Sequence, residues 1–154
     1  MEVINQVAPT DPNHIRKMME KGPDGPIFMI NLLKFKDKAE YQDGRETNLT
    51  GREAYALYSE LVADILPKFG GRFFFAADAT FLALGQVEEL WDEVAIAVYP
   101  ERVAMMQMSG SDEWQAAGQH RAAGLAGQLN IETVLQDWSK DLPWMKILLD
   151  QMGD

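Results

Sequence analysis

The sequence predicts an α+β fold in which helices cover one face of an antiparallel sheet, and two stretches indicate it. The run Ile27–Phe35 is apolar on both faces apart from one amide and one amine, which is typical of a buried strand. A helix is expected from about Thr50 to Phe69, and it stops at Gly70-Gly71 directly before a second apolar run that begins at Arg72. Strand, helix and strand in this order form the opening half of a βαββαβ domain.

Composition limits the classes of protein to consider. A chain of 154 residues is expected to form one domain over residues 1–154, with its core over residues 25–137. It contains no cysteine, which excludes thiolate sites and fits a reducing, cytoplasmic localisation. The formal net charge of −10 disfavours binding to nucleic acid or to an anionic membrane. No signal peptide and no membrane span are expected.

The segments around the first strand differ in character. A short helix over about residues 11–21 is expected before it, because Asp11 suits the N-cap and Pro12 suits the first helical position. After the strand, residues 36–49 are polar and exceed the usual length of a connection. Two interpretations of this segment stay open, a flexible loop and a lid over a binding site.

The central part of the chain is expected to form a helix and a hairpin. The helix begins with a capping box, in which Thr50 and Glu53 each bond the other residue's backbone N–H. Strands are expected over Arg72–Leu84 and Trp91–Tyr99, joined by a short turn at Gly85–Glu89.

The second half is expected to close the sheet. A helix opens at Pro100, breaks at Ser109-Gly110, and is followed by another from Ser111 to about Ala123. A closing strand over Gln128–Gln136 and an amphipathic helix over about residues 141–152 come last. The order is therefore helix, βαββαβ, helix, which is the ferredoxin-like plan with extra N- and C-terminal helices.

The second face of such a sheet needs a cover, because its own helices lie on one face only. The predicted strands stay apolar on both sides, and a bare face would expose more apolar surface than a monomer tolerates. A homodimer is therefore expected, in which two sheets form a shared barrel. The alternative cover is the chain's own terminal helices.

Five motifs in order resemble those of the DUF1330 family, which belongs to the dimeric α+β barrel superfamily. They are INLLKFK, TGREAYALY, FGGR, VAIAVYP and SDEWQAAGQHRAAGL, and they cover roughly residues 25–136. The resemblance implies the fold and the dimer. It implies no particular activity, because the family is one of unknown function and related barrels include cofactor-free monooxygenases, small-lactone isomerases and haem-binding enzymes.

Four side chains are candidates for binding a ligand, and each has an alternative structural role. Asn31 stands in the apolar first strand, where it either orients a ligand or pairs with a neighbour or a water. Lys34 lies near the end of that strand, where its amine reaches either a ligand or bulk water. Arg72 is a candidate anion contact or a partner of Glu60 or Asp64. Arg121 matches an arginine of the resembling sequences, and it suits a carboxylate clamp or a surface ion pair.

Four side chains are candidates for catalysis. His120 is the only histidine of the expected core, and imidazole suits proton transfer near neutral pH; the alternative is a solvent-facing histidine. Tyr55 and Tyr58 lie three residues apart on one helix, so they either bring hydroxyls to a cavity mouth or belong to the core. Asp92 is either a partly buried base with a raised pKa or a hydrated residue at a strand end.

These candidates lead to three hypotheses of function. Because metal-ligand clusters, phosphate loops and nucleophile elbows are lacking in the sequence, no metal and no cofactor are expected. The first hypothesis is a small-molecule enzyme or binding protein whose barrel cavity holds an apolar carboxylate or carbonyl compound. The second is a non-catalytic module for haem or another aromatic ligand, with His120 as iron ligand. The third is a structural dimer with a filled barrel.

Overall fold

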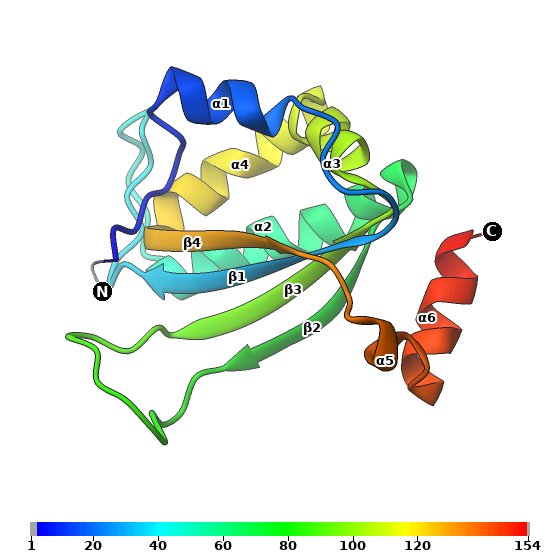
Figure 1. Ribbon diagram of the computed structural model, residues 1–154. Helices are drawn as coiled ribbons and strands as arrows, with labels where there is room; N and C mark the ends of the chain where they lie inside the picture. The colour runs from blue at the N-terminus through cyan, green and yellow to red at the C-terminus, as the bar shows by residue number, and fades with distance from the viewer. Residues whose placement is uncertain (1–2, 154) are drawn as a thin grey trace.

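The computed structural model describes residues 3–153 and has the predicted ferredoxin-like α+β fold (Figure 1). Residues 1, 2 and 154 of the expected domain lie outside the described residues. The core elements are β1 (Ile27–Phe35), α2 (Gly51–Ile65), β2 (Arg72–Asp78), β3 (Glu93–Tyr99), α3 (Arg102–Ser109), α4 (Asp112–Gly124) and β4 (Leu125–Thr133). The short helix α1 (Pro12–Met18) precedes them, and α5 (Asp137–Lys140) and α6 (Pro143–Gly153) follow.

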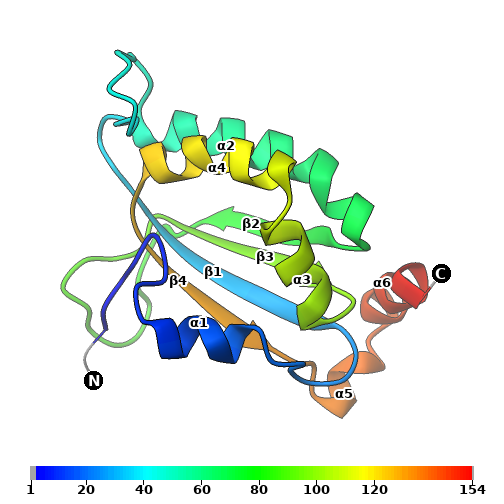
Figure 2. The same cartoon turned by 90° about the horizontal axis from the view of Figure 1, so that it is seen from above.

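The four strands form one antiparallel sheet in the order β2-β3-β1-β4. Ile30 of the central strand β1 lies opposite Ile96 of β3 and Ile131 of β4, which sets the register of the three strands. The helices α2 and α4 run side by side over one face of this sheet (Figure 2).

The main hydrophobic core lies between the sheet and these helices. Its most deeply buried side chains include Ile27, Leu33, Leu66 and Leu125. The backbones of α2 and α4 meet at Gly51 and Gly124, where a Cβ on Gly124 would collide with the carbonyl oxygen of Gly51. Glycine is therefore required at this crossing, because any side chain would push the two helices apart.

The opposite face of the sheet is covered at one end alone, within residues 3–153. The helix α6 lies beside that end of the sheet (Figure 1). Its Met145 packs against Phe28 and Val98. The remainder of the face is apolar and partly open, and it includes Ile30, Leu32, Val94, Ile96, Phe75 and Ile131. No helix in the described part of the chain is long and apolar enough to cross a membrane.

The predicted hairpin was wrong in its boundaries. β2 ends at Asp78 rather than at Leu84, and β3 begins at Glu93 rather than at Trp91, because Asp78 and Glu93 are the last paired residues of the two strands. The connection is a long loop over 79–92 instead of a short turn. Its tip projects from the sheet and leaves Leu84 91% exposed.

Other boundaries also differ from the prediction. The helix expected to reach Phe69 ends at Ile65 and continues as the 3-10 turn η1 (Leu66–Phe69), α3 begins at Arg102 rather than at Pro100, and β4 ends at Thr133 rather than at Gln136. β4 begins at Leu125 rather than at Gln128, because Leu125 already pairs with Phe35 of β1. The N-terminal helix covers residues 12–18 rather than 11–21, with Asp11 as its N-cap. The C-terminal helix begins at Pro143 rather than at residue 141, after the separate turn α5.

Candidate functional site

A cavity of about 710 Å³ lies on the helix-bearing side of the sheet, next to β4. The N-terminal segment with α1 forms one wall, and residues of β4, α3 and α4 form the others. Figure 1 shows α1 and α4 on the same side of the sheet, and the view from above in Figure 2 shows the two helices apart, with β1 and β4 visible in the gap. Its lining includes Val7, His14, Met29, Met105, Arg121 and Gln128.

A chain of three hydrogen-bonded side chains runs from Asn31 of β1 to Gln128 and Arg121, and the last two line this cavity. The Asn31 amide nitrogen donates to the backbone carbonyls of Met29, at 3.1 Å, and Ala95, at 3.4 Å. Asn31 Oδ1 therefore faces Gln128 and accepts from Nε2 at 2.7 Å. The Oε1 atom of Gln128 is then left to accept from a guanidinium nitrogen of Arg121.

This order of donors and acceptors fixes the position of Arg121. The two backbone carbonyls can only accept hydrogen bonds, so the amide nitrogen of Asn31 must face them. The oxygen of Asn31 then faces Gln128, which orients the Gln128 amide so that its oxygen faces Arg121. Gln128 is 7% exposed, which makes its two hydrogen bonds necessary. None of the ion pairs within residues 3–153 includes Arg121, so its charge has no carboxylate partner in the described part of the chain.

A second arginine ties α1 to the mouth of the cavity. Arg102 binds the carboxylate of Glu132 through Nε at 2.6 Å and Nη2 at 2.7 Å. This pairing lowers the pKa of Glu132. The Nη1 atom of Arg102 also donates to the carbonyls of Lys17 and Glu20, each at 3.3 Å, beside the C-terminal end of α1.

The two candidate tyrosines lie in the core. Tyr55 is 8% exposed and Tyr58 is 9% exposed, and burial raises the pKa of both hydroxyls. The nearby charge of Arg121 acts against this rise in pKa. Tyr58 accepts a hydrogen bond from Trp114 Nε1 at 3.2 Å. Both hydroxyls are thus held in the neutral form near pH 7, and a catalytic role for them stays a prediction.

His120 lies outside this cavity, against the 36–49 segment. Its Nδ1 atom is 2.7 Å from the Tyr41 hydroxyl. Burial lowers the pKa of His120, and the charge of Arg45 lowers it further. A role for His120 in proton transfer or as an iron ligand stays a prediction.

The 36–49 segment packs on α2 and α4 rather than over the cavity. Ala39 is 3% exposed and packs with Ala54 and Ala123. The backbone N–H of Glu40 also donates to the carbonyl of Ala123 at 3.0 Å. The chain that covers the cavity is instead the N-terminal segment, whose Gln6 N–H donates to the carbonyl of Gln128 at 3.1 Å.

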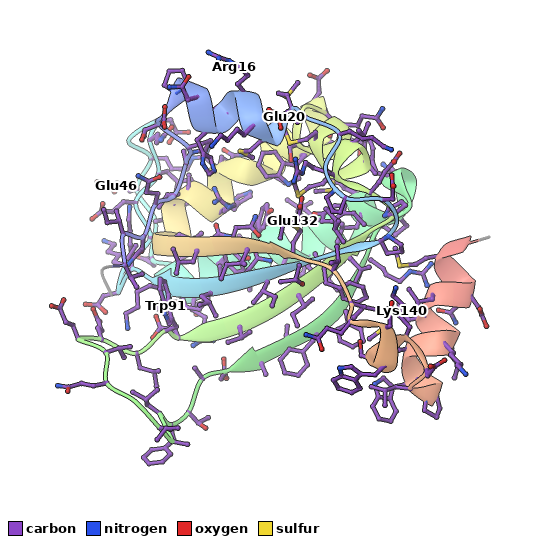
Figure 3. All side chains as sticks on the ribbon, viewed as in Figure 1. Arg16, Glu20, Glu46, Trp91, Glu132 and Lys140 are labelled. Carbon is purple, nitrogen blue, oxygen red and sulfur yellow. The ribbon has the colours of Figure 1, made fainter. Side chains whose placement is uncertain are left out.

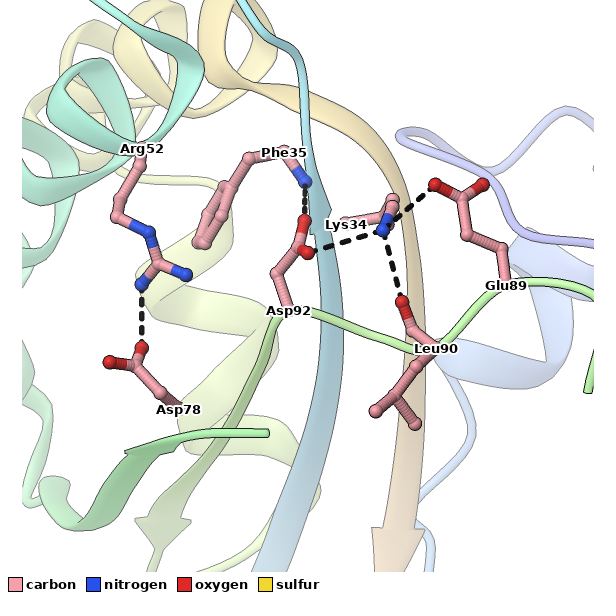
Figure 4. Close-up of polar contacts among 7 residues, drawn as sticks. All are labelled: Lys34, Phe35, Arg52, Asp78, Glu89, Leu90 and Asp92. Atoms are coloured by element: carbon pink, nitrogen blue, oxygen red, sulfur yellow. Dashed lines mark hydrogen bonds and ion pairs between the residues drawn. The ribbon is translucent and has the colours of Figure 1, made fainter. Parts of the chain in front are cut away.

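Lys34 and Asp92 meet each other at the base of the 79–92 loop, away from the cavity (Figure 4). Lys34 Nζ lies 2.9 Å from Glu89, 3.1 Å from Asp92 and 3.0 Å from the carbonyl of Leu90. The hydrogen bond with Glu89 is the main cause of the raised pKa of Lys34. The other carboxylate oxygen of Asp92 accepts from the Phe35 N–H at 2.8 Å. These contacts hold the loop against β1.

Arg72 also lies away from the cavity. Its Nη1 atom donates to the side chain of Gln151 in α6 at 2.8 Å, instead of pairing with Glu60 or Asp64. It therefore joins β2 to the C-terminal helix. Of the eight candidates, the structure joins Asn31 to Arg121 through Gln128, places Tyr55 beside Tyr58 and pairs Lys34 with Asp92. It leaves His120 and Arg72 apart from the others.

Gln128 and the N-terminal segment were missed by the sequence reasoning. A signal for Gln128 was available, because a polar residue in the closing strand beside a buried Asn31 indicates a pair of amides. No comparable signal exists for the N-terminal segment, since its place depends on contacts with β4. Within residues 3–153, no three His, Asp or Glu side chains gather as a metal site.

Comparisons with known proteins agree with this fold. Residues 45–133 match the family described as "Domain of unknown function (DUF1330)". Two crystal structures of RPA0582, a protein of unknown function from Rhodopseudomonas palustris, are similar to this chain. The methylated form has 30% sequence identity and a TM-score of 0.77 over 86% of this chain and 97% of its own. The other form has 28% identity and a TM-score of 0.76 over 86% and 99%.

A dimeric ferredoxin-like protein of unknown function from Thermobifida fusca is a more distant match. It has 17% identity and a TM-score of 0.46 over 75% of this chain and 99% of its own. That likeness is too weak to bear on assembly or function. No curated protein matches the sequence.

Proposed function

Since the chain belongs to the DUF1330 family, whose function is unknown, we propose a function from the cavity itself: it binds a small organic molecule that carries a carboxylate or carbonyl group. The observation that carries the proposal is Arg121. This residue lines the cavity, is held by Gln128, and has no carboxylate partner within residues 3–153. A half-buried guanidinium without a counter-charge is favourable for an incoming oxyanion, which it binds with two parallel hydrogen bonds.

Part of the remaining lining suits an apolar body, although charged side chains such as Lys17 and Glu20 also line the cavity. Met29, Met105 and Val7 provide apolar side chains, and the two methionines adapt to ligands of different shape. The volume of about 710 Å³ lies within the range of small-molecule sites. The ligand is therefore a compound of modest size, apolar along most of its length, with its oxygen atoms at one end.

The test compares phenylacetate with its uncharged analogue 2-phenylethanol in thermal unfolding. A ligand that binds the native state raises the melting temperature, and phenylacetate is expected to do so more than 2-phenylethanol. The substitution Arg121→Gln keeps a donor for Gln128 but removes the charge, so the effect of phenylacetate should disappear. Equal stabilisation of Arg121→Gln and the wild type would contradict the proposal.

Arg16→Gln is the matched control for this experiment. Arg16 belongs to α1 and projects away from the sheet (Figure 3). Its replacement changes the net charge of the protein by the same amount as Arg121→Gln. The control variant should therefore keep the response to phenylacetate, which separates a local contact from a general effect of charge.

We further propose that a second copy of the chain covers the open sheet face, to give a homodimer. The support is the apolar surface around Ile30 and Ile131, which α6 leaves uncovered in the described residues. Native mass spectrometry should give twice the protomer mass of 17.3 kDa. Ile30→Lys places a charge in the middle of this face and should yield monomers. A wild-type protein that stays monomeric at micromolar concentration would refute the dimer.

A further inference from the structure

A second cavity, of about 460 Å³, lies between α2 and the edge strand β2. It shares no lining residue with the Arg121 cavity in the described part of the chain. Its lining includes Tyr55, Glu60 and Ala63 from α2, Phe73 from β2, and Glu93 and Ala95 from β3. The cavity therefore combines apolar and aromatic walls with two carboxylates.

The second cavity differs from the first in its charged groups, because the first is lined by both cations and carboxylates and the second by carboxylates alone. None of the described residues that line it is Lys, Arg or His. Glu60 takes part in no ion pair within residues 3–153. The cation closest to Glu93 is Arg52, at 3.5 Å, and this arginine makes its shorter contact, of 2.6 Å, with Asp78. The negative charge at the cavity is thus incompletely compensated.

Tyr55 adds an independent indication of a ligand. Its side chain lines the cavity and is 8% exposed, yet its hydroxyl makes no hydrogen bond within residues 3–153. The neighbouring Tyr58 differs, because its hydroxyl accepts from Trp114. Among the described residues, the buried side-chain polar atom without a partner is Nε of Arg72, so the Tyr55 hydroxyl is accessible from the cavity and is free to bond to an atom of a bound molecule.

We propose that this second cavity binds an organic ammonium ion with an apolar or aromatic body. The ammonium hydrogens would bond to the carboxylates of Glu60 and Glu93 and to the oxygen of Tyr55. The apolar body would lie against Phe73 and the two alanines, where an aromatic ring also attracts a cation. Charge-assisted hydrogen bonds of this kind are stronger than neutral ones, so the carboxylates select amines over alcohols. This site is independent of the Arg121 cavity.

The test titrates the protein with 2-phenylethylammonium, followed by isothermal calorimetry and by NMR shifts of Ala63 and Ala95. Saturable binding is expected, and Glu60→Gln and Glu93→Gln should each weaken it about tenfold. Glu88→Gln is the matched control, because Glu88 is exposed in the 79–92 loop and lies outside the cavity lining. It should leave the affinity unchanged.

Three results would overturn the proposal. They are the lack of saturable binding at millimolar amine, equal affinity for 2-phenylethanol, and full affinity in the Glu60→Gln variant, whose exposed position on α2 makes unfolding no explanation. Arg121→Gln separates the two sites, because it should abolish the response to phenylacetate and leave binding of the amine intact. The experiments can therefore disprove the proposal for one site without affecting the proposal for the other.

Discussion

The hydroxyl of Tyr41 lies 2.7 Å from Nδ1 of His120, and this contact joins the 36–49 segment to α4. Either partner can donate, because the hydroxyl donates to a bare Nδ1 and a protonated Nδ1 donates to the hydroxyl oxygen. The guanidinium of Arg45 lies 4.5 Å from the centre of the Tyr41 ring. A positive charge on His120 is therefore unfavourable, in agreement with its lowered pKa.

Acidification should weaken the folded state through His120. Because burial and Arg45 lower the pKa of His120 below its usual value, the unfolded chain binds more protons than the native one. The stabilisation is fully present above the unfolded pKa of about 6.5 and is lost as the pH falls through the folded pKa. Urea unfolding at about pH 7.5 and 5.5 should show a smaller loss of stability in His120→Gln than in the wild type. Identical losses would contradict this prediction.

Asn31→Ala should destabilise the protein by about 1–3 kcal/mol, because it leaves the buried Nε2 of Gln128 without an acceptor. Asn130→Ala is a suitable control, since Asn130 lies directly opposite on β4 but is exposed. That variant should stay within about 0.5 kcal/mol of the wild type. Equal effects of the two substitutions in urea unfolding would show that the amide chain adds no stability.

The crossing of α2 and α4 permits a comparison of two glycines in one helix. Gly124→Ala should destabilise by about 1–3 kcal/mol, because the added methyl group meets the backbone of Gly51. Gly118→Ala should instead stabilise by about 0.5–1 kcal/mol, since a Cβ there has no neighbour within 4 Å among the described residues and alanine favours the helix. Thermal unfolding checks both signs, and a stable Gly124→Ala protein would disprove the tight crossing.

Arg102→Gln should release α1 from the cavity. No residue of α1, described over its whole length, is buried, so the contacts of Arg102 with the Lys17 and Glu20 carbonyls matter for its position. Hydrogen exchange of the α1 amides should be faster in this variant, while exchange in α2 is unchanged. Arg16→Gln again serves as control. Unchanged exchange in Arg102→Gln would show that other contacts hold the helix.

Local signals predicted the framework of the fold well. The capping box of Thr50 and Glu53 is present, and Gly70 ends the following turn with a φ of 77°. Both features depend on residues that are close together in the chain, so they can be predicted from the sequence. The membership in the DUF1330 family and the ferredoxin-like fold, both predicted, are confirmed.

The site was harder to predict because it depends on tertiary contacts. Arg72 and Lys34 are cations near the ends of strands, and Arg121 is a cation on a helix. From the sequence alone, each of the three is an equally good candidate for binding an anion. In the structure, Gln151 binds Arg72 and the 79–92 loop binds Lys34, which leaves Arg121 at the cavity. The partners of the first two arise from an added helix and a long loop, whose positions no local pattern specifies.

In the proposed homodimer, the C-terminal helix would also restrict how the two copies meet. Since α6 occupies the end of the sheet face next to Phe28 and Val98, a stacked copy cannot slide over that end. In such a dimer the helix would act as a steric stop that limits the possible alignments of the two sheets. Removal of α6 would expose more of the apolar sheet face and would also remove the steric constraint on how two copies align.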